Sequence, residues 1–151
     1  MTSSNEDFSA SVRAHFRYLV EDLGFALGED EWRQSSASYV VGYVSGTRYV
    51  RLLWGRKDAQ FYFSVHRSEG GGVPPRESPV NEWFYIFELM HHLVPDRGWV
   101  WDLDIGASDP TPGQLDEKVR LNAEVLRRYG WEILQGKRWY DSEAKAMVGG
   151  A

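Results

Sequence analysis

The sequence predicts an α+β fold: an antiparallel β-meander of three to five strands, with about three main helices packed mostly on one face. Residues 38–44, 47–54 and 60–66 are rich in Val, Tyr, Phe and Trp and predict three consecutive strands. Apolar residues at helical spacing lie before and after this block. The 151 residues are the size of one ordinary domain. We therefore expect a single globular domain with frayed ends at about 1–5 and 148–151.

The first helix is predicted before Gly24. Ser3 followed by Glu6, or Ser4 followed by Asp7, offers an N-terminal capping box. Gly24 suits the left-handed residue that often ends a helix. Apolar side chains at steps of three and four residues form the stripe of this helix: Phe8, Val12, Phe16, Leu19, Val20 and Leu23.

Within the sheet, residues 60–66 alternate most regularly, so one face of that strand meets the core. Residues 47–54 carry apolar side chains on both faces, as expected for a central strand. Ser45 and Gly46 predict a tight hairpin before it, because Gly adopts positive φ at little cost. A further short strand is predicted within residues 25–32.

A second helix is predicted between Pro79 and Pro95, after a Gly- and Pro-rich loop at residues 68–78. Ser78 suits its cap and Pro79 its first turn. Residues 98–105 then predict a short strand. The stripe of the second helix contains Trp83, Ile86, Phe87, Met90 and Val94.

A third helix is predicted from Thr111, with Pro112 in its first turn and Gln114 completing a capping box. Residues 131–134 predict one more apolar turn, and residues 141–147 a short terminal helix. The inner face of the third helix contains Leu115, Val119, Asn122, Val125, Leu126 and Tyr129.

The predicted core is strongly aromatic, because the chain has seven Trp, eight Tyr and seven Phe. Rings of this kind that remain partly exposed favour a binding surface. The predicted core contains Phe8, Phe16, Leu19, Leu23, Phe61, Phe63, Ile86, Phe87, Val119 and Leu126.

Composition excludes several classes of function. The chain has no Cys, which rules out disulfides, thiolate metal sites and a Cys nucleophile. No apolar run approaches the about 20 residues needed to span a bilayer, and the polar N-terminus does not resemble a secretory signal. The net charge of −5 argues against nucleic acid as a partner. We therefore expect a cytoplasmic protein with no membrane association and no cofactor.

Acidic residues are concentrated in two regions. Residues 1–31 carry seven acidic side chains against two Arg, and residues 96–117 carry six against one. Such surfaces suit the basic cleft of a partner protein and give fast, salt-sensitive association. The candidate partner-binding residues are Glu29, Asp30, Glu31, Asp102, Asp104 and Asp109.

An aromatic and acidic pocket near residues 99–104 is the alternative site, because aromatic side chains around a few polar groups typically line ligand pockets. Asp102 and Asp104 would share one face of a strand, and Glu88 would share a helix face with His91. Neither pair has the third ligand that a closed metal site needs, so no metal site is predicted. The candidate pocket residues are His91, Trp99, Trp101 and Asp102.

Three segments carry a resemblance. They are the stretch from Phe16-Arg17-Tyr18-Leu19 to Gly24-Phe25, the meander over residues 39–65, and the ending Tyr129-Gly130-Trp131-Glu132-Ile133-Leu134-Gln135-Gly136-Lys137. Together they resemble a diffuse group of small bacterial proteins, several of them immunity-like proteins of toxin–antitoxin neighbourhoods. The resemblance implies a non-enzymatic protein-binding module, an immunity protein that neutralises a toxin, with no catalytic residues to carry over. Two alternatives stay open: a small-ligand-binding protein or enzyme that uses the pocket, and a structural homodimer.

Overall fold

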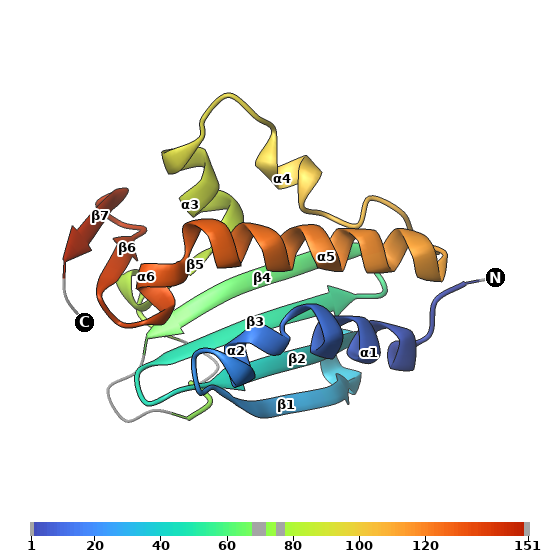
Figure 1. The fold of residues 1–151 in the computed structure, drawn as a ribbon. Helices are drawn as coiled ribbons and strands as arrows, with labels where there is room; N and C mark the ends of the chain where they lie inside the picture. Colours follow the sequence, from blue (N-terminus) through green and yellow to red (C-terminus); the bar gives the residue numbers. More distant parts are fainter. Residues whose placement is uncertain (1, 68–71, 75–77, 150–151) are drawn as a thin grey trace.

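The computed structural model describes residues 2–67, 72–74 and 78–149 and has the predicted α+β fold. Its five-stranded sheet is antiparallel throughout, and each strand pairs with its neighbours in sequence (Figure 1). The predicted loop at residues 68–78 lies largely outside the described residues. The strands are β1 (Ala26–Arg33), β2 (Ser38–Val44), β3 (Arg48–Gly55), β4 (Gln60–Arg67) and β5 (Trp83–Tyr85).

Helices cover one face of this sheet: α1, α2 and α5 cross it, while α3 and α4 lie beyond β4 and β5 (Figure 1). A separate two-stranded hairpin closes the chain beside α6. Two short 3-10 turns, η1 (Gln34–Ser36) and η2 (Val80–Glu82), precede β2 and β5. The remaining elements are α1 (Asn5–His15), α2 (Arg17–Glu21), α3 (Ile86–Leu93), α4 (Trp99–Asp102), α5 (Pro112–Tyr129), α6 (Trp131–Leu134), β6 (Arg138–Asp141) and β7 (Ala146–Gly149).

Capping boxes begin the two long helices as predicted. Of the two alternatives for α1, the second is used: Asp7 N–H donates to Ser4 Oγ (3.1 Å), and Ser4 N–H donates to Asp7 Oδ2 (2.7 Å). In α5, Gln114 N–H donates to Thr111 Oγ1 (3.2 Å). These bonds satisfy amide groups that a helix start otherwise leaves unpaired.

The first helix is interrupted at Phe16, which ends α1 and precedes α2. Gly24 follows α2 with the predicted left-handed backbone, at φ 74°. The start of the chain is held more firmly than expected, since Ser3 is buried and its N–H and hydroxyl both donate to Pro110 O. The break at Phe16 lets α1 and α2 follow the twisted sheet separately.

The hairpin between β2 and β3 differs from the prediction in its turn. Gly46 is not among the residues with positive φ. The turn is closed instead by Ser45, whose N–H donates to Arg48 O (2.8 Å) and whose Oγ accepts from Arg48 N–H (2.9 Å). A Ser side chain therefore stabilises the turn where a left-handed Gly was expected.

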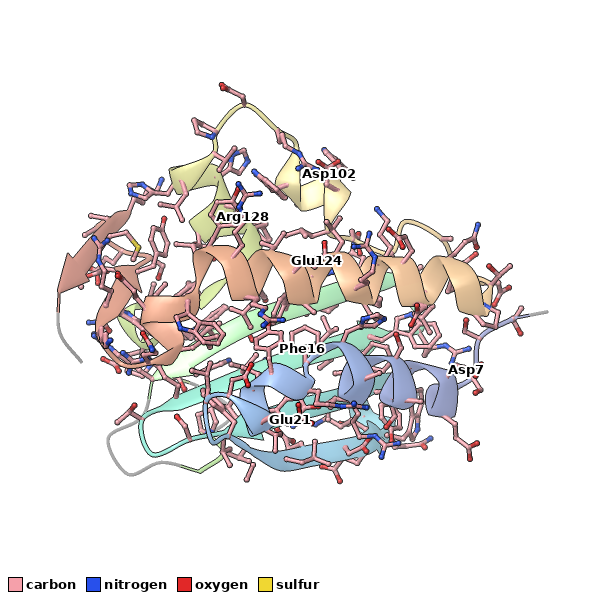
Figure 2. All side chains as sticks on the ribbon, viewed as in Figure 1. Asp7, Phe16, Glu21, Asp102, Glu124 and Arg128 are labelled. Atoms are coloured by element: carbon pink, nitrogen blue, oxygen red, sulfur yellow. The ribbon has the colours of Figure 1, made fainter. Side chains whose placement is uncertain are left out.

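One hydrophobic core lies between the sheet and the helices. Phe16 is 1% exposed and lies in the space between α2 and α5 (Figure 2), where its ring meets Phe63 edge to face at 5.5 Å. Seven of the ten predicted core residues are buried; Leu23, Phe61 and Phe87 are half-buried and pack against the others. Arg48 is also buried, because Ile133 O accepts from its Nε (2.9 Å) and its guanidinium covers the Trp139 ring.

Three predicted elements are wrong in type. Residues 83–85 form strand β5 rather than the start of a helix, so the second helix begins only at Ile86. Residues 99–102 form the helical turn α4, although a strand was expected. The predicted terminal helix is the β6–β7 hairpin, in which Asp141 Oδ1 accepts from the N–H groups of Glu143 and Ala144.

Among the helices within the described ranges, none combines the length and the apolar surface that crossing a bilayer requires.

Candidate functional site

The outer edge of β4 is only partly paired. β3 pairs with β4 along its whole length, whereas β5 pairs only with Ser64, Val65 and His66. The chain turns away into α3 directly after Tyr85. Within the described part of the chain, residues 60–63 therefore have a strand neighbour on one side only.

Asp104 covers part of this open edge. Its Oδ1 accepts from Phe61 N–H (2.8 Å) and from Ile105 N–H (2.8 Å). The first bond shows that the Phe61 amide points away from β3. Because alternate residues of an antiparallel strand direct their peptide groups to the same side, the Phe63 peptide also faces outward. The open edge thus offers backbone hydrogen-bonding groups beside an aromatic surface.

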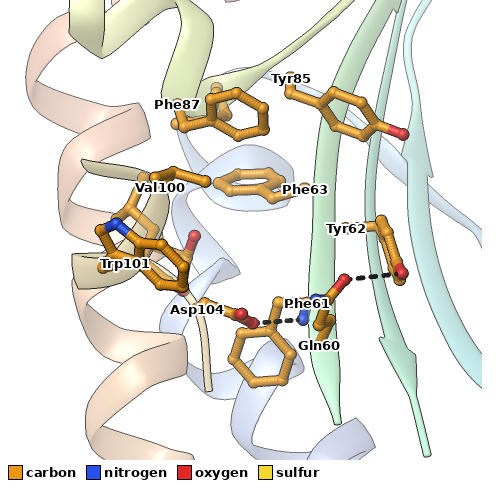
Figure 3. Close-up of a pocket in the computed structure, with 12 residues that line it drawn as sticks. Gln60, Phe61, Tyr62, Phe63, Tyr85, Phe87, Val100, Trp101 and Asp104 are labelled. Carbon is orange, nitrogen blue, oxygen red and sulfur yellow. Dashed lines mark hydrogen bonds between the residues drawn. The ribbon is translucent and has the colours of Figure 1, made fainter. Parts of the chain in front are cut away.

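A pocket of about 320 Å³ lies at this edge, between β4, α3, α4 and α5. We call it the β4-edge pocket. Figure 3 shows Phe63, Phe87, Val100 and Trp101 around the same space, with Asp104 and Phe61 below them. Its volume is near the lower end of the range for ligand pockets, and half of its twelve lining residues are aromatic. The pocket can accept one ring-sized apolar group.

Asn122 adds a buried polar group to the wall of the pocket. The residue is 0% exposed, and its Nδ2 donates to Leu103 O (2.9 Å) and Lys118 O (2.8 Å). Its Oδ1 is buried and has no hydrogen-bond donor among the described residues. An unpaired buried acceptor costs about 1–3 kcal/mol, so a bound group that donates a hydrogen bond here would recover part of that cost.

Trp101 stands at the mouth of the pocket and is 77% exposed. Its position follows from the way α4 is anchored. Trp99 is buried, and its Nε1 donates to Val94 O (2.9 Å). Arg97 covers the Trp99 ring and pairs with Asp102 at 2.9 Å. With Trp99 held inside, the four-residue helix turns Trp101 outward.

Tyr62 borders the pocket from the other side of β4 (Figure 3). Its hydroxyl donates to Asp58 and lies 2.9 Å from Gln60 Oε1. The hydrogen bond to Asp58, followed by burial, raises the pKa of Tyr62 to about 12. The hydroxyl therefore stays protonated at neutral pH and acts as a donor.

The structure places only part of the predicted pocket in the pocket wall. Of the four predicted pocket residues, Trp101 lines it, whereas Trp99 is buried on the inner side of α4 and Asp102 pairs with Arg97. Asp104, which was predicted as a partner-binding acid, also lines the pocket. His91 is exposed beside a different depression, next to His92 and Tyr140. The structure thus has a pocket near residues 99–104 whose lining differs from the predicted set.

The six predicted partner-binding acids do not form one surface. β1 and β4 lie at or near opposite edges of the sheet, so the acids of residues 29–31 are far from those of residues 102–109. Glu29 binds Tyr49 and Arg33, while Asp30 accepts from Ser9 and Tyr39 on the opposite face. The exposed acids without a partner among the described residues are Glu31 and Asp109.

The described residues contain no group of three His, Asp or Glu side chains positioned to hold a metal ion. Glu88, one of the two residues considered for a metal, instead accepts from Tyr85 N–H (3.1 Å) at the start of α3.

Sequence reasoning missed Asn122 and the second role of the aromatic side chains. Phe61, Phe63 and Phe87 belong to the predicted core and do contact it, but they also line the pocket. The available signal was Asn122 itself, a polar residue within the apolar stripe of a helix. A polar residue at such a position needs a hydrogen-bond partner. Asking which group pairs with Asn122 would have directed attention to this wall.

Fold and site together define an α+β protein with an aromatic pocket at an open strand edge. Comparisons of the chain with family models, with curated proteins and with solved structures find no match.

Proposed function

We propose that this protein is a non-enzymatic protein-binding module, and that its partner inserts one aromatic side chain into the β4-edge pocket. The observation that carries this proposal is the 77% exposure of Trp101 at the mouth of the pocket. Trp is the residue type most enriched among the few residues that dominate binding energy at interfaces. Burial of its exposed area by a partner is a large favourable term.

A partner protein fits this site better than a free small molecule, because the apolar surface continues outside the pocket. Trp101 is 77% exposed and the neighbouring Val100 40%, and a ligand that fits within about 320 Å³ would cover only part of this exposed apolar surface at the mouth. A protein surface covers both the pocket and this rim. The outward-facing peptide group of Phe63 adds a hydrogen-bonding partner for the main chain of such a segment.

The buried Oδ1 of Asn122 favours an inserted side chain that carries a donor. Tyr and Trp combine a ring with one hydrogen-bond donor, whereas Phe and Leu would leave the acceptor unpaired. We therefore propose Tyr or Trp as the inserted residue.

The resemblance to immunity-like proteins supports a toxin as the partner, and the absence of Cys fits the cytoplasm as the compartment. The net charge of −5 supports a basic partner, since long-range attraction would accelerate the encounter. In this proposal Glu31 and Asp109 contribute to the field that attracts the partner, and Trp101 provides the contact.

Replacing Trp101 by Ala should weaken partner binding by about 30-fold or more, the effect of losing at least about 2 kcal/mol at a central interface residue. The matched control is Trp32→Ala, since Trp32 is also exposed but lies on β1 away from the pocket. Both variants should keep the stability of the wild type within about 0.5 kcal/mol, because surface substitutions rarely exceed that value.

The measurement is quantitative capture from the native host with all three proteins as baits, followed by titration of the captured protein. A stoichiometric partner retained by wild type and Trp32→Ala but lost by Trp101→Ala supports the proposal. Equal recovery with Trp101→Ala, or repeated recovery of no partner, contradicts it.

A small-ligand-binding protein is the second candidate, and the unpaired Oδ1 of Asn122 is the observation that favours it. Native mass spectrometry of protein purified from the host separates the candidates. A bound small molecule on the monomer favours the second candidate, and a dimer mass favours the structural homodimer.

A further inference from the structure

The lining of the β4-edge pocket favours positive charge. Half of its twelve lining residues are aromatic, and none of the described lining residues is Lys, Arg or His. The face of an aromatic ring is the negative end of its quadrupole and attracts cations. The lining adds one carboxylate, that of Asp104. A cationic group is therefore a better electrostatic match for this pocket than an anionic one.

The Asp104 carboxylate is fixed in place but not neutralised. Its Oδ1 accepts from Phe61 N–H and from Ile105 N–H, each at 2.8 Å. The side chain remains partly exposed at the pocket. Among the described residues, none forms an ion pair with Asp104 and none donates to its Oδ2. This second oxygen is thus available to a charged donor that enters the pocket.

Two basic side chains bind α4, but neither belongs to the lining of the pocket. Lys118 Nζ donates to Asp102 O (2.7 Å). Arg97 pairs with the Asp102 carboxylate at 2.9 Å and lies 4.0 Å from the centre of the Trp99 ring. Both cations are engaged by Asp102, so a positive charge beside Asp104 would come from the molecule that occupies the pocket.

Trp101 provides a second group that attracts a cation. Its ring is 77% exposed at the mouth of the pocket. Figure 3 shows Asp104 below Trp101, between that ring and the ring of Phe61. Trp is the aromatic residue with the strongest attraction for Lys and Arg. A cation at the mouth can therefore contact the Trp101 ring and reach the Asp104 carboxylate.

We infer that the partner segment carries Lys or Arg next to the Tyr or Trp that it inserts, and that Asp104 and the Trp101 ring bind this cation. The inference rests on the proposed function, which supplies the inserted ring. One ring fills about 320 Å³, so the neighbouring residue of the segment stays at the mouth, where Trp101 and Asp104 are exposed. An acidic residue at the same place would meet the like charge of Asp104 and be disfavoured.

The test is a titration at pH 7 and constant ionic strength with three capped tripeptides: Lys-Tyr-Lys, Gln-Tyr-Gln and Glu-Tyr-Glu. NMR signals of the Trp101 indole and the Asn122 side-chain amide report whether each peptide binds in the pocket. Wild type should bind the Lys peptide at least about fivefold more tightly than the Gln peptide, because a charge-assisted bond and a cation–π contact are added. The Glu peptide should bind most weakly.

Asp104→Asn keeps an oxygen that can accept from Phe61 N–H and Ile105 N–H but removes the charge. This variant should bind the Lys and Gln peptides within about twofold of each other, because the charge-assisted bond is lost. Asp109→Asn is the matched control, since it removes the same formal charge from an exposed acid outside the pocket lining. It should keep the wild-type preference. Trp101→Leu alters an exposed side chain, should also reduce the preference, and serves if Asp104→Asn does not fold.

Equal affinity of the three peptides for wild type would overturn the inference while leaving the pocket for an inserted ring intact. An equal loss of preference in Asp104→Asn and Asp109→Asn would also overturn it, because long-range attraction alone would then explain the result. So would the absence of saturable binding of the Lys peptide to wild type. Capture of the partner with Trp101→Ala tests the proposed function independently of all three results.

Discussion

Phe16→Ala is expected to lower the free energy of unfolding by about 3–5 kcal/mol, the usual cost of removing a buried Phe side chain. Phe16 is 1% exposed at the junction of α1 and α2. Its ring packs edge to face on Phe63 at 5.5 Å and stacks on Tyr18 at 6.2 Å. Residues on α2 and β4 would lose contacts together.

Urea denaturation followed by Trp fluorescence measures this change. Val20→Ala is the matched control, because Val20 lies on α2 and is 45% exposed, so its loss should cost no more than about 0.5 kcal/mol. A destabilisation below about 1 kcal/mol for Phe16→Ala would show that the helix face is assigned wrongly.

Acidification should destabilise the protein through His66 by about 3 kcal/mol between pH 6.5 and pH 4. Burial, followed by the charge of Arg51, lowers the pKa of His66 from 6.5 to about 4. The unfolded chain therefore binds the proton first as pH falls. The stability due to neutral His66 is fully present above about pH 6.5 and is lost as pH falls to about 4.

Among the described residues, the groups packed around His66 do not offer a compensating negative charge. Ser64, Tyr49 and Trp83 contact it, and Arg51 opposes its protonation. Free energies of unfolding at several pH values between 4 and 7.5 should fall less steeply for His66→Gln than for wild type. His91→Gln, which alters an exposed His, should follow the wild type. Identical pH dependence in wild type and His66→Gln would contradict the lowered pKa.

The elements with strong local signals were predictable. α5 carries a Thr111 cap, a Pro in its first turn and an apolar stripe. Each of these signals depends on residues that are close together in the sequence. The strands β2, β3 and β4 are separated by short turns, so antiparallel pairing with neighbours in sequence is the simplest arrangement. These features depend on residues within a few positions of one another.

The errors occur where a short segment had two compatible local structures. Residues 83–85 continue the stripe of α3, yet the free edge of β4 offers them strand pairing with residues 64–66. Asp141 can cap a helix or close a turn with the same side-chain bonds, and the second strand of the hairpin selects the turn. Such choices are settled by contacts with distant residues.

The candidate sites likewise depend on contacts between distant residues, which the sequence does not reveal. Sequence alone was sufficient to predict an α+β meander and its main helices, because periodicity and caps are local properties. Only the tertiary structure decided that Trp101 faces outward, that Asn122 reaches the pocket wall, and that Arg51 forms no ion pair with another described residue. Each of these depends on which side chains from separate elements meet, and on how strand pairing stops short at Tyr85.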